Sequence, residues 1–146
     1  MALLFKKLVK EKGKPPVQKE FRLDHDHTVR FNSKGLVPVI VQDLETGEVL
    51  RLAYMDRWAL DSSLEDKTVY IYHRRSQRME RLGKKDGIEY HLESVKLDES
   101  HNTLLFQVTP TDHQSPKTAF SCEITLFSKE DLFEDENQED SDSQQG

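Results

Sequence analysis

The stretch Leu36 to Leu60, LVPVIVQDLETGEVLRLAYMDRWAL, decides the fold of this chain. Residues 37–41 form a short apolar run whose proline lies near its start, where a strand tolerates one. Residues 45–48, ETGE, are typical of a turn, and a second strand-like run follows directly at residues 49–54. Together these segments predict a β-hairpin.

A helix is expected to follow this hairpin. Asp56 is a favourable N-cap residue, because its carboxylate can accept a hydrogen bond from a free backbone N–H of the first turn. Trp58, Leu60 and Leu64 then fall at positions from which they can reach a core, and the helix is expected to end near residues 66–68.

The rest of the central region predicts more strands. Polar loops are expected at residues 74–87 and 98–102, and the strand-like runs between and after them are residues 68–72, 88–97, 103–109 and 119–127. Six strands and one internal helix predict an α+β domain built on an antiparallel sheet. The chain has no G-x-x-x-x-G-K or G-x-G-x-x-G motif, which disfavours the nucleotide-binding folds that those motifs mark.

Composition sets the extent of this domain. The chain has 146 residues, of which 35% are hydrophobic and 33% charged, a low apolar share unless some segments stay unpacked. From Lys129 to the end there are one lysine and eight acids, whereas the net charge of the whole chain is −6. We therefore expect residues 128–146 to be a disordered acidic tail, with an acidic docking segment for a basic partner as the alternative.

The N-terminal residues 1–28 are expected to form a basic extension. Residues 1–20 hold six lysines and two acids, and an apolar stripe at residues 4–9 predicts a short amphipathic helix that Pro15 and Pro16 end. A helix packed on the domain or paired in an oligomer is favoured over a membrane-surface helix, because the apolar face is barely two turns long. No signal peptide or membrane span is evident, and one cysteine permits no internal disulfide, so we expect a cytoplasmic protein.

The opening stretch, extended upstream to VRFNSKGLVPVIVQD at residues 29–43, resembles the opening of the phosphoribosyl-AMP cyclohydrolase family. This family opens the purine ring of phosphoribosyl-AMP in histidine biosynthesis. The resemblance spans about Val29 to Leu126, and it indicates a domain of this kind over residues 29–127. It also implies a homodimer whose subunits interlock and build sites from both chains.

The metal-binding motifs that the resemblance implies are largely lost. The family holds its metals with a D-C-D-G-D turn and a C-H-T-G-x-x-S-C segment, which here are DESHN at residues 98–102 and SPKTAFSC at residues 115–122. Of three carboxylates only Asp98 remains, and of three cysteines only Cys122. Serine and asparagine are poor substitutes as ligands. We therefore expect no cofactor and no cyclohydrolase activity, because zinc is what activates water in this chemistry.

A rebuilt zinc site is the alternative, and it would preserve an active metal-dependent hydrolase. Its candidate ligands are Asp98, Glu99, His113 and Cys122, and His101 could join them. Cys122 by itself is expected to be a small buried residue in an apolar strand.

The run from Asp24 to His27, DHDH, is a separate cluster that resembles a metal site in composition. A solvated turn, or a strand that faces water, explains it equally well.

Phosphate binding is the family property expected to survive. The family's S-R-S-R-G and W-x-K-G-E-T-S-G loops correspond here to residues 73–77 and 80–87, although Lys84 replaces the acid of the second motif. The candidate phosphate-binding residues are Arg74, Arg75, Arg78, Arg81, Gly83, Lys84 and Gly87.

Guanidinium groups bind phosphate through paired hydrogen bonds, so this loop could hold a nucleotide or a sugar phosphate; a solvated charged loop is the alternative. Nucleic acid is disfavoured, because the pI is about 5.5 and no aromatic residues alternate with the basic ones.

Three functional hypotheses result. The first is a degenerate family member that binds a phosphorylated ligand without cyclohydrolase activity, and the second is a working hydrolase with a remodelled zinc site. The third is a partner subunit that uses its basic N-terminus and acidic tail as contacts. Function belongs to the site, so the resemblance of the scaffold does not choose among them.

Overall fold

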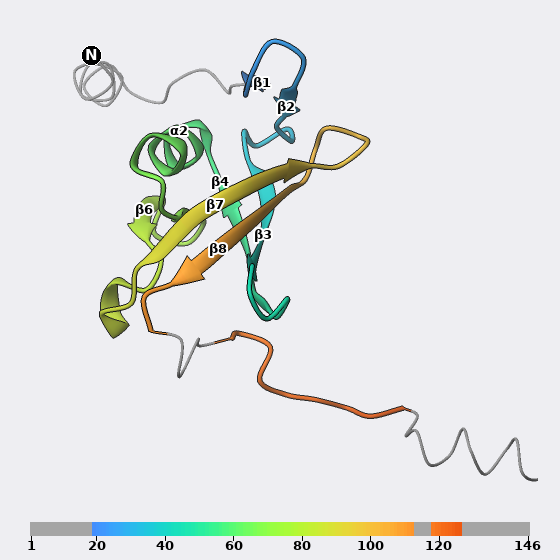
Figure 1. Cartoon of the computed structure of the whole chain (residues 1–146). Helices are drawn as coiled ribbons and strands as arrows, with labels where there is room; N and C mark the ends of the chain where they lie inside the picture. The colour runs from blue at the N-terminus through green and yellow to red at the C-terminus, as the bar shows by residue number, and fades with distance from the viewer. Residues whose placement is uncertain (1–18, 113–117, 127–146) are drawn as a thin grey trace, which may run out of the picture.

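The computed structural model describes residues 19–112 and 118–126 (Figure 1). The amphipathic helix expected at residues 4–9, the tail from residue 128 and His113 lie outside the described residues. The described elements are β1 (Glu20–Arg22), β2 (Thr28–Arg30), β3 (Val37–Asp43), β4 (Val49–Met55), α2 (Arg57–Asp66), β5 (Tyr70–His73), β6 (Arg78–Arg81), the 3-10 helix η1 (Lys84–Asp86), β7 (Tyr90–Leu97) and β8 (Leu104–Pro110).

The largest sheet has four strands in the order β4-β3-β8-β7. β3 pairs with β4 in antiparallel register, as the hairpin prediction requires, and β7 pairs with β8 in the same manner. β8, however, runs parallel to β3, with Val39 opposite Leu104 and Asp43 opposite Val108. The α+β class is confirmed, but the expectation of an antiparallel sheet is wrong for its central pair.

The parallel pair has a physical explanation in the long connection between its strands. A parallel neighbour requires a crossover of a dozen or more residues, whereas an antiparallel neighbour needs only a tight turn. Between β3 and β8 the chain forms β4, α2, the β5–β6 hairpin, η1 and β7. This length allows β8 to enter beside β3 in the same direction.

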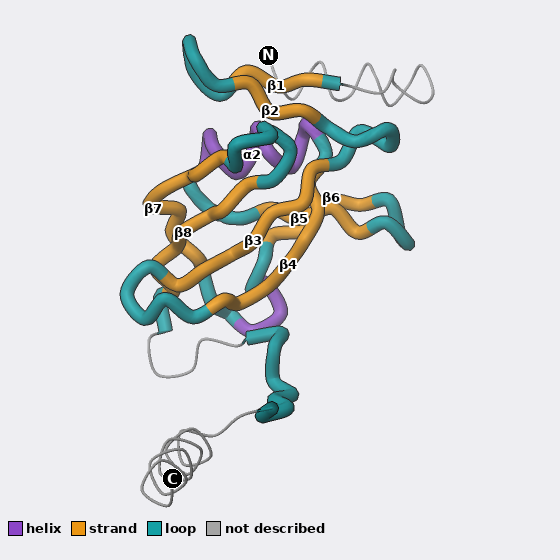
Figure 2. The backbone as a smooth tube through the Cα atoms, turned by 90° about the vertical axis from the view of Figure 1, so that its right-hand side faces the viewer, coloured by secondary structure: helices purple, strands orange, loops and turns teal. Residues whose placement is uncertain are grey.

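The core lies on one face of the two central strands. In β3, residues 37, 39, 41 and 43 are buried and the residues between them are partly exposed, which is the period of two expected for a strand. β8 repeats this pattern, with Phe106 fully buried at its centre. α2 adds Ala59 and Leu60 to the same core. Figure 2 shows α2 and the β1–β2 hairpin together at one end of the sheet.

The helix begins and ends where the sequence predicted. The Asp56 carboxylate accepts a hydrogen bond from the backbone N–H of Ala59 at 2.8 Å, and Lys67 ends the helix in a left-handed conformation. The buried Ser63 hydroxyl donates to the carbonyl of Ala59 at 2.7 Å and accepts from the N–H of Tyr70 at 2.8 Å. This serine therefore ties α2 to β5.

The strand expected at residues 119–127 is wrong for the part that the structure describes. Residues 118–126 contain no strand. Their beginning is hydrogen-bonded to β4, from the Ala119 N–H to the Leu50 carbonyl at 2.7 Å and from the Thr118 hydroxyl to the Val49 carbonyl at 2.9 Å. Phe120, Ile124 and Leu126 are 59%, 80% and 81% exposed. The alternating apolar pattern is present, but residues 19–112 and 118–126 offer these side chains no surface to pack on.

Three strands were not predicted. β1 and β2 have three residues each, and β6 lies inside the expected loop at residues 74–87. The sequence of β6, RMER, has too few apolar residues to show a strand period. Within the described ranges, no helix is long and apolar enough to cross a membrane.

Phe106 provides a test of this core. Replacement of Phe106 by alanine should lower the free energy of unfolding by about 3–5 kcal/mol, because the residue is fully buried in the central strand β8. Leu44→Ala is the control. Because Leu44 is 46% exposed, this substitution should lower the free energy of unfolding by much less than Phe106→Ala does. Urea denaturation measures both. Equal losses for the two variants would contradict the described core.

Candidate functional site

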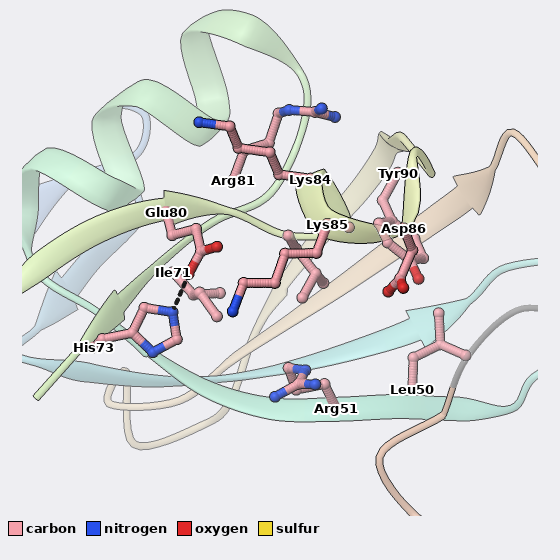
Figure 3. A pocket seen from close by; sticks show the side chains of 12 residues that line it. Leu50, Arg51, Ile71, His73, Glu80, Arg81, Lys84, Lys85, Asp86 and Tyr90 are labelled. Carbon is pink, nitrogen blue, oxygen red and sulfur yellow. Dashed lines mark hydrogen bonds and ion pairs between the residues drawn. The ribbon is translucent and has the colours of Figure 1, made fainter. Parts of the chain in front are cut away.

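A cavity of about 190 Å³ opens between β4, the β5–β6 hairpin and η1 (Figure 3). Its apolar wall is formed by Leu50, Ile71 and Tyr90, which are all less than a tenth exposed. Its polar lining combines one histidine, two carboxylates and four cations, namely His73, Glu80, Asp86, Arg51, Arg81, Lys84 and Lys85. The cations outnumber the carboxylates, so the cavity favours an anion.

His73 and Glu80 are joined by a hydrogen bond on the wall of this cavity. His73 ends β5 and Glu80 lies in β6, two strands that pair in antiparallel register. The His73 Nε2 lies 2.7 Å from a Glu80 carboxylate oxygen, and the two side chains are 43% and 34% exposed. This contact leaves the second ring nitrogen of His73 and the second oxygen of Glu80 available to a ligand.

The four cations come from three different elements. Arg51 belongs to β4, Arg81 to β6, and Lys84 and Lys85 to η1. Among the residues that the structure describes, none of the four forms an ion pair with a carboxylate. In Figure 3, Arg51 and Lys85 extend into the opening that His73 faces, whereas Arg81 and Lys84 extend to the other side of the ribbon. Like charges held together without a counter-ion repel one another, and a bound anion relieves that repulsion.

Only some of the predicted phosphate-binding residues belong to the lining of this cavity. Arg81, Gly83 and Lys84 line the cavity, but Arg74, Arg75, Arg78 and Gly87 do not. The Arg74 guanidinium instead stacks on the ring of Tyr54, with 4.6 Å between its central carbon and the ring centroid.

Sequence reasoning did not select Arg51, His73, Glu80, Lys85 or Tyr90 as site residues, although all five line the cavity. The available signal was the resemblance of residues 73–77 and 80–87 to two motifs of the family, because these segments contain His73, Glu80 and Lys85. Arg51 comes from a strand far away in the sequence.

Two glycines shape the η1 turn that carries Lys84 and Lys85. Gly83 and Gly87 flank η1 with φ angles of +84° and +68°, a backbone conformation that disfavours other residues. A Cβ atom on Gly83 would lie 2.3 Å from the carbonyl oxygen of Ile88 and 2.8 Å from the ring of Tyr90. A Cβ atom on Gly87 would meet no atom within 4 Å. Only Gly83 is therefore required by both conformation and space.

The candidate metal ligand Asp98 closes the turn between β7 and β8. One of its carboxylate oxygens accepts hydrogen bonds from the backbone N–H groups of Asn102 and Thr103, both at 2.9 Å. His101 has a positive φ of 62°, and its ring Nδ1 lies 3.2 Å from the Thr28 carbonyl oxygen. Asp98 therefore stabilises the turn itself, and His101 connects the turn to β2.

Cys122 is exposed, so the expectation of a buried cysteine is wrong. It lies in the segment 118–126, which departs from the end of the sheet opposite to the β7–β8 turn (Figure 1). Glu99 and Cys122 are therefore not brought together within one chain. In the described ranges, no three His, Cys, Asp or Glu side chains are grouped closely enough to hold a metal ion.

The loop of Asp24 to His27 is organised by Asp24. Its carboxylate accepts hydrogen bonds from the backbone N–H groups of Asp26 and His27, and it lies 2.7 Å from the His27 ring Nδ1. The hydrogen bond with the His27 ring is the main cause that lowers the pKa of Asp24, and the same contact raises the pKa of His27. This arrangement supports a solvated turn.

Comparisons with known proteins show what the chain is similar to. No family model matches it. It is 33% identical over 120 residues to the phosphoribosyl-AMP cyclohydrolase of Prosthecochloris aestuarii, an alignment that covers 73% of this chain and 88% of that protein. It is also 37% and 39% identical over 95 residues to the histidine biosynthesis bifunctional proteins HisIE of Staphylococcus aureus and Thermus thermophilus. Those alignments cover 63% of this chain and less than half of each bifunctional protein, 45% and 44% respectively.

The two glycines provide a matched test of the turn. Gly87→Ala should cost roughly 1–2 kcal/mol, the penalty of a left-handed backbone for an L-residue. Gly83→Ala should cost clearly more, because the Ile88 carbonyl or the Tyr90 ring must also move away from the added methyl group. Urea denaturation of both variants measures the difference, and equal costs would contradict the close approach at Gly83.

The Asp24 and His27 pair predicts a pH dependence. Because the pKa of His27 is raised and that of Asp24 is lowered, the pair stabilises the loop between these two values. The contribution is lost as pH rises through the raised pKa of His27, or falls through the lowered pKa of Asp24. In NMR titrations, Asp24→Asn should lower the midpoint of His27, while the amide oxygen can still accept the backbone hydrogen bonds. An unchanged midpoint would refute the assignment.

Proposed function

Because the chain belongs to the phosphoribosyl-AMP cyclohydrolase family, we propose that it is a diverged member that binds a nucleotide or sugar phosphate and lacks the metal-dependent ring-opening activity. The proposal carries over from its relatives the scaffold and an anion site. It does not carry over their metal chemistry.

The cation-lined cavity is the observation that supports ligand binding. Arg51, Arg81, Lys84 and Lys85 line one small cavity, and none is paired with a carboxylate among the described residues. Phosphate is the common anion that matches such a set, because arginine donates paired hydrogen bonds to it and lysine supplies a compact charge. A loop that was merely solvated would not need to bring the Lys85 side chain of η1 and the Arg51 side chain of β4 into one opening.

The donor set supports the loss of metal chemistry. A hydrolytic zinc site needs three protein ligands and an open position for water, and thiolates serve best in the motifs that this family uses. The chain has one cysteine in total. Its remaining carboxylate of the first motif, Asp98, already accepts two backbone hydrogen bonds. These residues do not fit a zinc ion that activates water.

A second candidate function is a hydrolase with a zinc site built between two subunits. One observation favours it: Glu99 and Cys122 are both exposed, and each is therefore accessible to a second chain. Ligands from opposite ends of one sheet can meet only in an assembly. This candidate keeps zinc as the cofactor and the purine ring as the substrate.

Self-association is part of the proposal. Phe120, Cys122, Ile124 and Leu126 alternate along a segment that is exposed in the single chain, so they form one apolar face of a potential strand. We propose that this face packs on a second copy of the chain in a homodimer. The dimer is proposed to work in the cytoplasm, where a single exposed thiol stays reduced.

Purified protein separates the two candidate functions. The first expects no near-stoichiometric zinc in metal analysis, no conversion of phosphoribosyl-AMP, and a melting temperature that AMP raises. At a ligand concentration of 100 times Kd the stabilisation should be about 2.7 kcal/mol, which is a shift of several degrees. Stoichiometric zinc that is lost in Cys122→Ala, together with ring opening, would establish the second function instead.

A further inference from the structure

We propose that the acidic segment at residues 130–136, EDLFEDE, binds across the cation-lined cavity of its own chain. In this arrangement the Phe133 ring contacts the apolar wall, and acids on both sides of it pair with Arg51 and Lys85. The inference rests on the proposed function in one respect, because it concerns the same cavity. It names a different occupant, a peptide of the chain itself, and it makes the affinity of the cavity for other anions depend on this segment.

The acidic segment can reach the cavity because the chain that leads to it is attached at the cavity wall. The Ala119 N–H donates a hydrogen bond of 2.7 Å to the carbonyl of Leu50, and Leu50 lines the cavity. Seven residues lead from Ala119 to Leu126, and another seven lead from Leu126 to Phe133. The second stretch can therefore cover the length of the first in the opposite direction. A segment tethered at this point has a high effective concentration at the cavity, so contacts that are weak one by one suffice.

The charges of the segment and of the cavity are opposite. Residues 130–136 hold five carboxylates and no basic residue. The cavity lining holds four cations and two carboxylates, and one of these carboxylates, Glu80, is hydrogen-bonded to His73. Arg51 and Lys85 extend into the opening, and neither pairs with a carboxylate of residues 19–112 or 118–126 (Figure 3). An arginine binds a carboxylate through two parallel hydrogen bonds, and a lysine attracts it as a compact charge.

The apolar wall matches the two apolar residues in the middle of the segment. Leu132 and Phe133 separate two acids from the next three. Solvated acidic segments are generally poor in aromatic residues, so Phe133 is the feature that indicates a contact. The cavity of about 190 Å³ has room for one aromatic ring, since an engineered apolar cavity of about 150 Å³ binds benzene. Its apolar lining consists of Leu50, Ile71 and Tyr90.

A bound segment excludes other anions from the cavity. A ligand then binds only to the molecules whose cavity is open, so its apparent Kd rises by the inverse of that fraction. If the segment occupies the cavity in roughly four of five molecules, the apparent affinity falls about fivefold. Salt weakens this competition, because the Debye length falls from about 30 Å at 0.01 M to about 3 Å at 1 M.

A zero-length cross-link tests the contact in the full-length chain. A carbodiimide activates carboxylates, and a lysine in direct contact then forms an amide with one of them. Lys84 and Lys85 are a matched pair, because both are exposed residues of η1 but only Lys85 extends into the opening. Mass spectrometry should find residues 130–136 joined to Lys85 several times more often than to Lys84. Equal yields would indicate a diffuse attraction and overturn the inference.

An isotopic mixture identifies the chain that supplies the segment. Labelled and unlabelled protein are mixed before cross-linking, with 15N as the label. Cross-linked peptides should be entirely labelled or entirely unlabelled, because the segment and the cavity belong to one chain. Peptides that combine the two isotopes would show docking on a second copy, and they would overturn the assignment.

Two full-length variants measure the competition. Phe133→Ala changes no charge, so its effect cannot arise from net charge, and a triple variant combines Glu134→Gln, Asp135→Asn and Glu136→Gln. At about 10 mM ionic strength, calorimetry should show AMP binding to each variant about threefold to fivefold more tightly than to the unchanged chain. Phe127→Ala is the matched control, because it removes the same ring outside the segment, and it should leave the affinity unchanged.

The outcomes separate this inference from the proposed function. If AMP binds the unchanged chain and the variants with equal affinity, the inference fails while the proposed function stands. If AMP binds none of these proteins but the Lys85 cross-link forms within one chain, the proposed function fails while the inference stands.

Discussion

The parallel pairing of β3 with β8 is the constraint on which the rest of the structure depends. It places five residues of β3 directly opposite five of β8, from Val39 and Leu104 to Asp43 and Val108. The buried faces of the two strands form the centre of the core. β4 and β7 then become the outer strands of the sheet, so Arg51 lies at one edge and the β7–β8 turn with Asp98 lies at an end distant from Cys122. One pairing thus brings the cavity together and separates the potential metal ligands.

Local signals in the sequence predicted local structure well. The β3–β4 hairpin and the start of α2 at Asp56 depend on residues a few positions apart, and both are confirmed. The direction of β8 depends on a connection of some sixty residues, about which no turn signal gives information. The strand β6 was missed for a different reason, because its charged sequence contributes a wall to the cavity and little to the core.

The candidate site was predictable only in part. The excess of basic residues after β6 was visible in the sequence, and Arg81, Gly83 and Lys84 do line the cavity. Arg51 could not be selected, because a strand position reveals its neighbours only after the sheet is assembled. Arg74 is the opposite case. It lies in a motif that was expected to bind phosphate, but its guanidinium stacks on the ring of Tyr54. Sequence motifs therefore located the region of the site but not its chemistry.

The proposed site also has a consequence for the reaction it can support. A zinc ion lowers the pKa of a bound water toward neutrality, and it does so by direct coordination. Arginine and lysine hold an anion by charge and hydrogen bonds, but they offer no open coordination position to a water molecule. Fixed cations around the same cavity would also repel a divalent metal ion. The cationic lining that favours an anion therefore works against the binding of a divalent metal ion at that cavity.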